Sequence, residues 1–201
     1  MFTGIIQAVG KITAVEALQQ GVRLTVDGGR LELGDVAIGD SIAHNGVCLT
    51  VVTKAGNTYQ LDVSRETLNC TVGLGVQGGR VNLEKALCLS DRLGGHLVSG
   101  HVDGVGEVVA FDDIGESWKL VVRAPQELAK FIALKGSITI NGVSLTVNEV
   151  EGTEFNINLI PHTLKMTMLN ELKAGARVNL EIDLIARYVE RMMNAEKELT
   201  K

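Results

Sequence analysis

The chain has few aromatic residues and no stretch dominated by positive charge. Four Phe, two Tyr and one Trp among 201 residues are too few for the stacking platforms that bind single-stranded nucleic acids. The formal net charge is −5, and Lys and Arg do not gather in any run, as a face for duplex DNA would require. We therefore expect no nucleic acid partner.

Long apolar runs and a leader-like N-terminus are missing as well. No apolar run approaches the ~20 residues that span a bilayer, and "MFTGIIQAVGK" lacks a basic segment followed by an apolar one. We expect a soluble, cytoplasmic protein without a membrane partner. Its three cysteines, Cys48, Cys70 and Cys88, form no C-x-x-C pair, so we expect reduced thiols.

Signatures of phosphate and metal binding are weak. "GLGVQGG" at 73–79 is rich in glycine, but no GK[ST] follows it, so it is typical of a loop rather than a phosphate cradle. His96 and His101 are five residues apart, a spacing that does not place both on one face of a strand or helix. No acidic or cysteine cluster accompanies them. We expect no metal site.

An internal repeat is the strongest feature of the sequence. "HNGVCLTV" at 44–51 returns as "INGVSLTV" at 140–147, and residues 3–71 align with 99–167 without a gap. "RVNLE" occurs at both 80–84 and 177–181. A period near 96 residues is too long for a solenoid and indicates a duplicated domain. We expect domains at 1–95 and 96–184, followed by a tail at 185–201.

Short, β-branched segments separated by Gly, Asn and Asp predict a mainly β fold, either a barrel or a sandwich. The segments are "RLTV", "YQLDV", "RVNLE", "GEVVAF", "KLVVR" and "EFNINLI". Asn45-Gly46 and Asn141-Gly142 lie between apolar runs, which is the strongest short hairpin signal. A short helix is expected at 125–134, where Pro125 suits the first turn, with a weaker counterpart at 30–37.

The tail predicts an amphipathic helix at 184–199. Its large apolar residues recur at helical spacing on one face, at Ile185, Tyr188, Val189, Met192 and Leu199. The stripe could pack on the protein's own domains. Copies of the same chain are an equally good partner for it.

Differences between the two copies point to specialised chemistry. Several polar positions are shared, which is typical of a scaffold used twice: Ser41/Ser137, Asn45/Asn141, Thr50/Thr146 and Thr67/Thr163. By contrast, His101 takes the place of Ile5, while His44 and Cys48 face Ile140 and Ser144. Each could be a satisfied core or turn residue. Their titratable character within matched motifs favours function.

These motifs resemble one enzyme family. "MFTGI", "AHNGVCLTV", "GGHLVSGH", "INGVSLTV" and "LIPHTL" are similar, in this order and over nearly the whole chain, to riboflavin synthase. The resemblance implies two six-stranded Greek-key β-barrels in tandem, joined into a homotrimer by the C-terminal helix. It further implies an active site where the first barrel of one subunit meets the second barrel of a neighbour. Lumazine synthase is a further partner to consider.

The resemblance also implies the reaction. Two molecules of 6,7-dimethyl-8-ribityllumazine exchange a four-carbon unit to give riboflavin and 5-amino-6-ribitylaminouracil, without metal or redox cofactor. A duplicated barrel would supply one pocket for the donor and one for the acceptor. Asn141 and His162 stand where the family often has acidic residues.

Residues expected to contact substrate lie in matching parts of the two repeats. Strand backbone would meet the pyrimidinedione edge, hydroxyls and carboxylates would meet the ribityl chain, Lys135 would orient one substrate, and Phe2 would cover a ring. The expected set is Phe2, Gly4, Ile5, Ile6, Cys48, Leu49, Thr50, Asp62, Val63, Ser64, Arg65, Glu66, Thr67, Gly100, His101, Val102, Lys135, Ser144, Leu145, Thr146, Asn158, Leu159, Ile160, Pro161, His162 and Thr163.

In the reaction that the resemblance implies, the chemical step starts with loss of a proton from the C7 methyl group. A histidine has an ordinary pKa near neutrality and suits a proton shuttle, so His101 is the expected catalytic base. Activation of the other molecule at C7 needs a nucleophile, which could be water, Ser41 or Cys48.

Three alternatives compete with this interpretation. Lumazine-binding antenna proteins share the duplicated fold without catalysis, so function depends on the site rather than the fold. A flavin-dependent reductase would need a G-x-G-x-x-G fingerprint opening a βαβ unit. "GLGVQG" at 73–78 has the glycine spacing, but no helix pattern begins there. A purely structural module is disfavoured because the copies differ at titratable residues.

Overall fold

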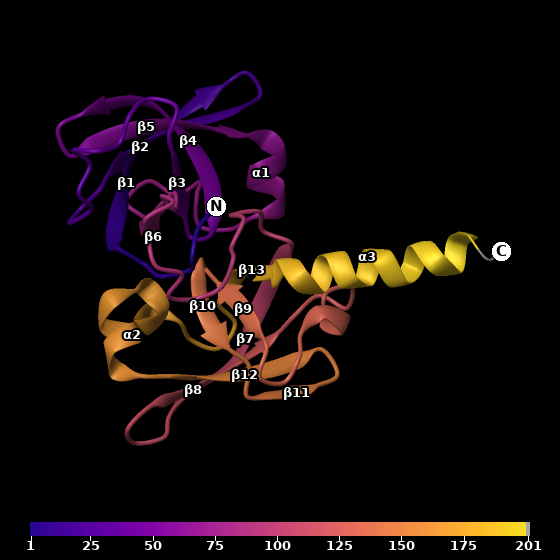
Figure 1. Cartoon of the computed structure of the whole chain (residues 1–201). Helices are drawn as coiled ribbons and strands as arrows, with labels where there is room; N and C mark the ends of the chain where they lie inside the picture. Colours follow the sequence, from indigo (N-terminus) through magenta and orange to yellow (C-terminus); the bar gives the residue numbers. More distant parts are fainter. Residues whose placement is uncertain (200–201) are drawn as a thin grey trace.

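Two β-rich units lie one above the other, and a long C-terminal helix projects from their junction (Figure 1). This arrangement comes from a computed structural model that describes the backbone of residues 1–199 and the side chains of residues 1–195. The mainly β class predicted from the sequence is confirmed, as is the two-unit architecture with a terminal helix.

The first repeat is a closed antiparallel barrel with strand order β1-β2-β5-β4-β3-β6. Its strands are β1 (Ala8–Leu18), β2 (Gly21–Asp27), β3 (Ser41–His44), β4 (Val47–Ala55), β5 (Thr58–Ser64) and β6 (Arg80–Lys85). Alternate side chains point inward, so that Leu24, Val26, Leu61 and Val63 are all buried in its core. A short helix, α1 (Arg65–Cys70), follows β5.

The second repeat keeps the same strand order but breaks it at one point. Its strands are β7 (Gly104–Asp113), β8 (Trp118–Arg123), β9 (Ser137–Ile140), β10 (Val143–Thr146), β11 (Glu149–Glu151), β12 (Glu154–Leu159) and β13 (Arg177–Ile182). The sheet runs β10-β9-β13-β7-β8-β12-β11, so β10 and β11 together replace β4.

The expected second six-stranded barrel is therefore a curled seven-stranded sheet. The break falls at Val147 and Asn148, whose amides donate to Gly136 O (3.0 Å) and Asn156 O (2.9 Å) respectively. In the first repeat, the corresponding place is only a bulge between Val51 and Thr53. The strand of the second repeat therefore divides at the position where the first repeat has its bulge.

Both Asn-Gly turns and all six quoted strand segments are confirmed. Asn45 and Gly46 have φ of 49° and 83°, and Asn141 and Gly142 have φ of 47° and 79°, as tight hairpins require. The helix expected at 125–134 is only the 3₁₀ turn η1 (Ala129–Phe131).

The helix expected at 30–37 is absent, because its backbone is used differently. The Lys54 ammonium donates to the carbonyls of Leu33 (2.7 Å) and Val36 (2.5 Å), which a helix would need for its own bonds. Two short helices that were not expected follow the fifth strand position of each repeat: α1 and α2 (Pro161–Met166), the latter followed by the 3₁₀ turn η2 (Met168–Glu171).

Reciprocal contacts relate the two repeats by an approximate two-fold axis. Asn82 Nδ2 donates to Asn141 O, and Asn179 Nδ2 donates to Asn45 O, both at 3.0 Å. In each repeat the turn asparagine accepts from the backbone of its own strand asparagine, at 2.8 Å for Asn45 and 2.9 Å for Asn141. The Asn of each "RVNLE" motif therefore joins one barrel to the turn of the other.

The terminal helix α3 (Leu184–Leu199) leaves its apolar stripe uncovered. Tyr188 and Met192 are 63% and 70% exposed. The helix is fixed at its base by Arg187, which pairs with Asp103 at 2.8 Å, and by an ion pair between Lys130 and Glu190. The stripe does not pack on the protein's own barrels up to Met193; the Leu199 side chain and residues 200–201 lie outside the described part.

A buried histidine distinguishes the first barrel core. His44 Nδ1–H donates to Ile42 O (3.0 Å), which leaves Nε2 to accept from the Tyr59 hydroxyl (2.8 Å). Burial lowers the pKa of His44 to about 3, so the ring stays neutral. The second repeat has Ile140 and Phe155 at the same places, which gives an apolar version of this pair.

We predict that His44 makes the fold sensitive to acid. Its folded pKa lies below the ordinary value near 6.5, so the unfolded chain takes up a proton first and stability falls as the pH drops through that value. The loss between pH 8 and pH 5 is about 2 kcal/mol. In urea unfolding at both pH values, the double variant His44→Ile/Tyr59→Phe should lack this component, while Tyr59→Phe alone should keep it. Equal pH slopes for wild type and double variant would contradict the prediction.

Candidate functional site

A cavity of about 200 Å³ opens on the first barrel where the second repeat begins, and we name it the Cys48 cavity. It is lined by Val47, Cys48, Glu66, Thr67, Cys70, Thr71, Gly100, His101 and Val102. Strand β4, helix α1 and residues 100–102 each supply one wall. The structure thus brings together Cys48 and His101, which the sequence analysis singled out from opposite repeats.

Each repeat begins with a lead segment, residues 2–6 and 98–102, and each lead segment packs on the other repeat's barrel. Val102 packs against the first barrel's core and Ile6 against the second's. Gly100 O accepts from Cys48 N at 2.8 Å. The two segments also pair with each other, through Phe2 N to Val98 O (2.7 Å) and the reverse bond (3.1 Å). We call the place where a lead segment packs on the other repeat a crossing. Because of this packing, His101 of the second repeat reaches a cavity of the first barrel.

Helix α1 presents its polar side chains to the cavity. Ser64 caps the helix by accepting from Thr67 N at 3.1 Å, as serine does at helix starts. The cap starts the helix directly after β5, which places Glu66 and Thr67 beside Cys48. The Cys70 thiol donates to Glu66 at 3.2 Å, and this bond raises the pKa of the thiol.

The equivalent place on the second repeat is occupied by the chain itself. Ser144 N donates to Gly4 O at 2.8 Å, which mirrors the Cys48 contact. However, the Ser144 hydroxyl lies 2.7 Å from Nδ1 of His96, and a side chain at Gly95 would collide with Ser144. Burial lowers the pKa of His96, and its Nε2 is buried without a hydrogen-bond partner among the described residues. The segment between the repeats therefore covers the Ser144 site.

Other expected residues lie elsewhere. Ser41 faces a separate cavity of about 390 Å³ that also contains Asp40, Lys85 and Cys88. Phe2 is fully buried against Ala43 and Val98, so it does not face the Cys48 cavity.

The remaining expected contacts fall into three groups. Asp62 pairs with Arg23 at 2.7 Å on the barrel surface, and Lys135 donates to Asn148 at 3.1 Å. The side chains of Leu49, Val63 and Leu159 are buried in the cores, and Leu145 packs against the second core. Residues left at the surface or at corners of the two repeats are Ile5, Thr50, Ser64, Arg65, Thr146, Asn158, Ile160, Pro161, His162 and Thr163.

Reasoning from the sequence missed several residues at these sites. Cys70 and Thr71 line the Cys48 cavity. They lie in "ETLNCT" (66–71), which aligns with "HTLKMT" (162–167) at the end of the repeat, and this similarity could have indicated them. His96 is not among the residues expected to contact substrate. Asn141, which departs from the family pattern, serves the turn: its Oδ1 accepts from Asn179 N at 2.9 Å.

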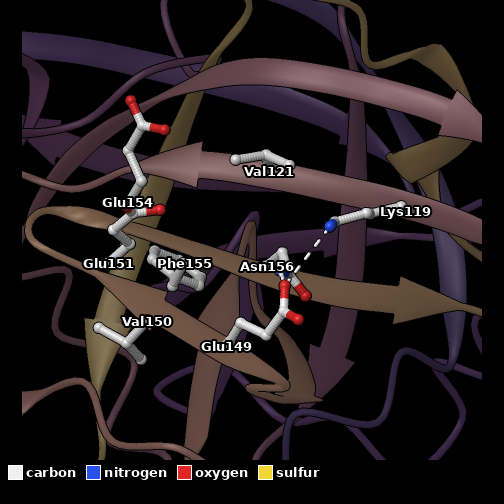
Figure 2. A pocket seen from close by; sticks show the side chains of 8 residues that line it. All are labelled: Lys119, Val121, Glu149, Val150, Glu151, Glu154, Phe155 and Asn156. Atoms are coloured by element: carbon white, nitrogen blue, oxygen red, sulfur yellow. Dashed lines mark hydrogen bonds and ion pairs between the residues drawn. The ribbon is translucent and has the colours of Figure 1, made fainter.

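A larger cavity, of about 450 Å³, lies on the outer face of the second sheet (Figure 2). Figure 2 shows it between β8, β11 and β12, with Lys119 directed toward Glu149. It contains no residue that the sequence analysis selected, and its acidic side chains are open to solvent. We therefore place the candidate site at the Cys48 cavity.

The described residues contain neither a metal-binding cluster nor a membrane-spanning helix. No group of three or more His, Cys, Asp or Glu within that part of the chain is arranged to hold a metal ion. None of the helices in residues 1–199 has the length and apolarity needed to cross a membrane.

Two duplicated β-rich units with crossed lead segments, and a cavity where the second lead segment meets the first barrel, are typical of a small-ligand-binding protein. The family model for the lumazine binding domain matches residues 3–86 and 99–183. Riboflavin synthase of Photobacterium phosphoreum is 46% identical over 98% of this chain and 91% of its own length. The Brucella abortus riboflavin synthase is 45% identical over 98% and 100%, and that of Bacillus subtilis is 39% identical over 98% and 92%.

Solved structures show the same architecture. LumP complexed with riboflavin matches with a TM-score of 0.83, and LumP complexed with 6,7-dimethyl-8-(1'-D-ribityl) lumazine with 0.80. Both are 28% identical and cover 90% of this chain and 99% of their own. The chain belongs to the riboflavin synthase family of proteins with duplicated lumazine-binding domains. The resemblance and the enzyme class predicted from the sequence are confirmed at this level.

We predict that replacing Gly100 by alanine destabilises the fold where the second lead segment packs on the first barrel. Its φ is +78°, and an added Cβ would lie 2.7 Å from Cys48 Cβ and 2.8 Å from Phe2. Gly115→Ala is the matched control, because φ is +101° there but no atom lies within 4 Å. In urea unfolding, Gly100→Ala should lose about 2 kcal/mol more stability than Gly115→Ala, because overpacking adds to backbone strain. Similar losses in both variants would show that the crossing is loosely packed.

Proposed function

We propose that the protein is a riboflavin synthase that converts two molecules of 6,7-dimethyl-8-ribityllumazine into riboflavin and 5-amino-6-ribitylaminouracil. The observation that carries the proposal is the Cys48 cavity, in which His101 from the second repeat faces Cys48 and Thr67 from the first. Because one substrate gains the four carbons that the other loses, the atoms balance without an external oxidant or reductant.

In this mechanism the protein mainly orients two identical molecules, which turns their encounter into a reaction between held neighbours. The carbanion formed at the C7 methyl group is delocalised into the ring, so a weak base suffices. His101 takes up that proton at the edge of the cavity. In the Cys48 cavity, Cys48 or water adds at C7 of the acceptor. Ser41, the third candidate nucleophile, faces a separate cavity, so its participation would require a different substrate position. Glu66 and Thr67 bind ribityl hydroxyls.

The second substrate requires a second pocket, which we place at the Ser144 crossing. That site must open at Gly95 and His96 for a ligand to reach the Ser144 hydroxyl. A cavity of about 200 Å³ is also smaller than the usual 300–1,000 Å³ of sites for ligands of this size. Both points favour an active site completed by a neighbouring subunit.

We propose a homotrimer as that assembly. The exposed apolar stripe on α3, with Ile185, Tyr188 and Met192 above 60% exposed, is the surface that a second copy would cover. The free thiols of Cys48, Cys70 and Cys88 suit the reducing cytoplasm. Lumazine synthase, which would supply the substrate, is a further partner to test.

A non-catalytic lumazine-binding antenna is the second candidate. It is favoured by the similarity to LumP, whose solved complexes hold the lumazine, riboflavin or flavin mononucleotide. The synthase function accounts better for the pairing of Cys48 and His101 in one cavity, since simple binding needs neither a nucleophile nor a base.

Purified protein incubated with 6,7-dimethyl-8-ribityllumazine alone should form riboflavin without any added cofactor. The product ratio should be one riboflavin for every two lumazines consumed, followed by absorbance and fluorescence. Tight binding with unchanged, bright lumazine emission would establish the antenna function instead.

Variants at the cavity should separate the roles of its two titratable side chains. His101→Gln should lower kcat by at least about 100-fold, because general base catalysis typically contributes that much. Cys48→Ser tests the thiol, since activity above half of wild type would rule out an obligatory thiolate. Full turnover by His101→Gln would remove His101 as the proton shuttle.

A further inference from the structure

A buried carboxylate from the second sheet holds the segment that carries His101. Glu181 on β13 is 1% exposed. Its Oε1 accepts from the amide and the hydroxyl of Ser99, both at 2.6 Å. Its Oε2 accepts from Gly100 N at 3.0 Å and from His101 N at 3.1 Å. One side chain therefore fixes three consecutive residues.

An ionised carboxylate is costly in free energy to bury, and the hydrogen bonds that Glu181 accepts offset part of this cost. Burial penalises the ionised carboxylate and raises the pKa of Glu181, while the bonds from Ser99 and Gly100 act in the opposite direction. Hydrogen bonds to an ionised acceptor are shorter and stronger than neutral ones. These bonds hold the segment so that Gly100 O accepts from Cys48 N and the His101 side chain lines the cavity.

We propose that Glu181 is the positioning residue for His101. Two anchors then flank the histidine. Glu181, from the second repeat, fixes the backbone before and at residue 101, and the packing of Val102 on the first core fixes the residue after it. Because the imidazole position must be accurate to within about 0.5 Å for catalysis, loss of one anchor should reduce the chemical step more than substrate binding.

The other repeat provides a matched comparison. Glu84 on β6 is 3% exposed and accepts from Thr3 N (2.7 Å), Thr3 Oγ1 (2.6 Å) and Gly4 N (2.9 Å). The next residue there is Ile5 rather than a histidine. The same clamp is therefore built twice, and only the copy centred on Glu181 holds a residue that can move a proton.

This proposal can be tested in two ways. The kinetic test rests on the proposed function, whereas the spectroscopic test depends on the fold alone. Glu181→Gln keeps the volume but replaces one acceptor oxygen by a donor amide. It should lower kcat at least about tenfold while KM changes less than about threefold. Glu151→Gln, which removes an exposed charge far from the cavity, should leave both constants unchanged.

The amide resonances of Gly100 and His101 report their hydrogen bonds to Glu181 whether or not the protein turns over substrate. In ¹H–¹⁵N spectra, Glu181→Gln should shift the Gly100 and His101 amide protons upfield and leave those of Thr3 and Gly4 in place. Glu84→Gln should give the reverse pattern. If the Gly100 and His101 amides do not move in Glu181→Gln, the positioning role is refuted whether or not the wild type turns over.

The kinetic outcomes are equally decisive. If the wild type forms no riboflavin, the proposed function fails and the spectra alone test the clamp. If Glu181→Gln is folded and keeps kcat within about twofold, the proposal is overturned. Should Glu181→Gln not fold, Ser99→Ala removes a single hydroxyl bond outside the barrel strands. It should lower kcat about two- to fivefold with KM unchanged, and unaltered kcat would refute the proposal.

Discussion

Contact between two Asn-Gly turns determines how the two halves of this protein fit together. Gly46 and Gly142 approach so closely that a Cβ on either would lie 2.8 Å or 2.6 Å from the other's backbone nitrogen. Both have φ values that favour glycine. The Asn side chains of the two "RVNLE" strands then donate across the axis to the turn carbonyls. One local motif therefore makes both a hairpin and an interface.

The crossed lead segments follow from that interface. Once the turns meet, Phe2 and Val98 lie close enough to pair, and each lead segment continues onto the opposite barrel. The result is that Cys48 and His101, 53 positions apart in sequence and in different repeats, line one cavity. Differences between the copies can then alter one crossing while the other keeps the shared scaffold.

Local signals in the sequence were sufficient for the strands, the turns and α3, because alternation, Asn-Gly pairs and helical spacing all act over short distances. The split between β10 and β11 was not predictable, since neither Gly nor Pro marks the break at Val147 and Asn148. Helix α1 is six residues long, too short to show periodicity. Glu181 bonds to residues about 80 positions away, and no local pattern indicates a partner at that distance.

The crossing also constrains what a single repeat could be. Residues 98–102 complete the first barrel's cavity, and residues 2–6 pack on the second sheet. An isolated first repeat would therefore have an unfinished pocket, and either repeat alone would have a lead segment with nothing to pack against. Two copies of one repeat could satisfy each other by exchanging these segments across an exact two-fold axis, as an isologous dimer does. The fused chain gives up that exact symmetry, and in doing so allows a histidine to stand at one crossing and an isoleucine at the other.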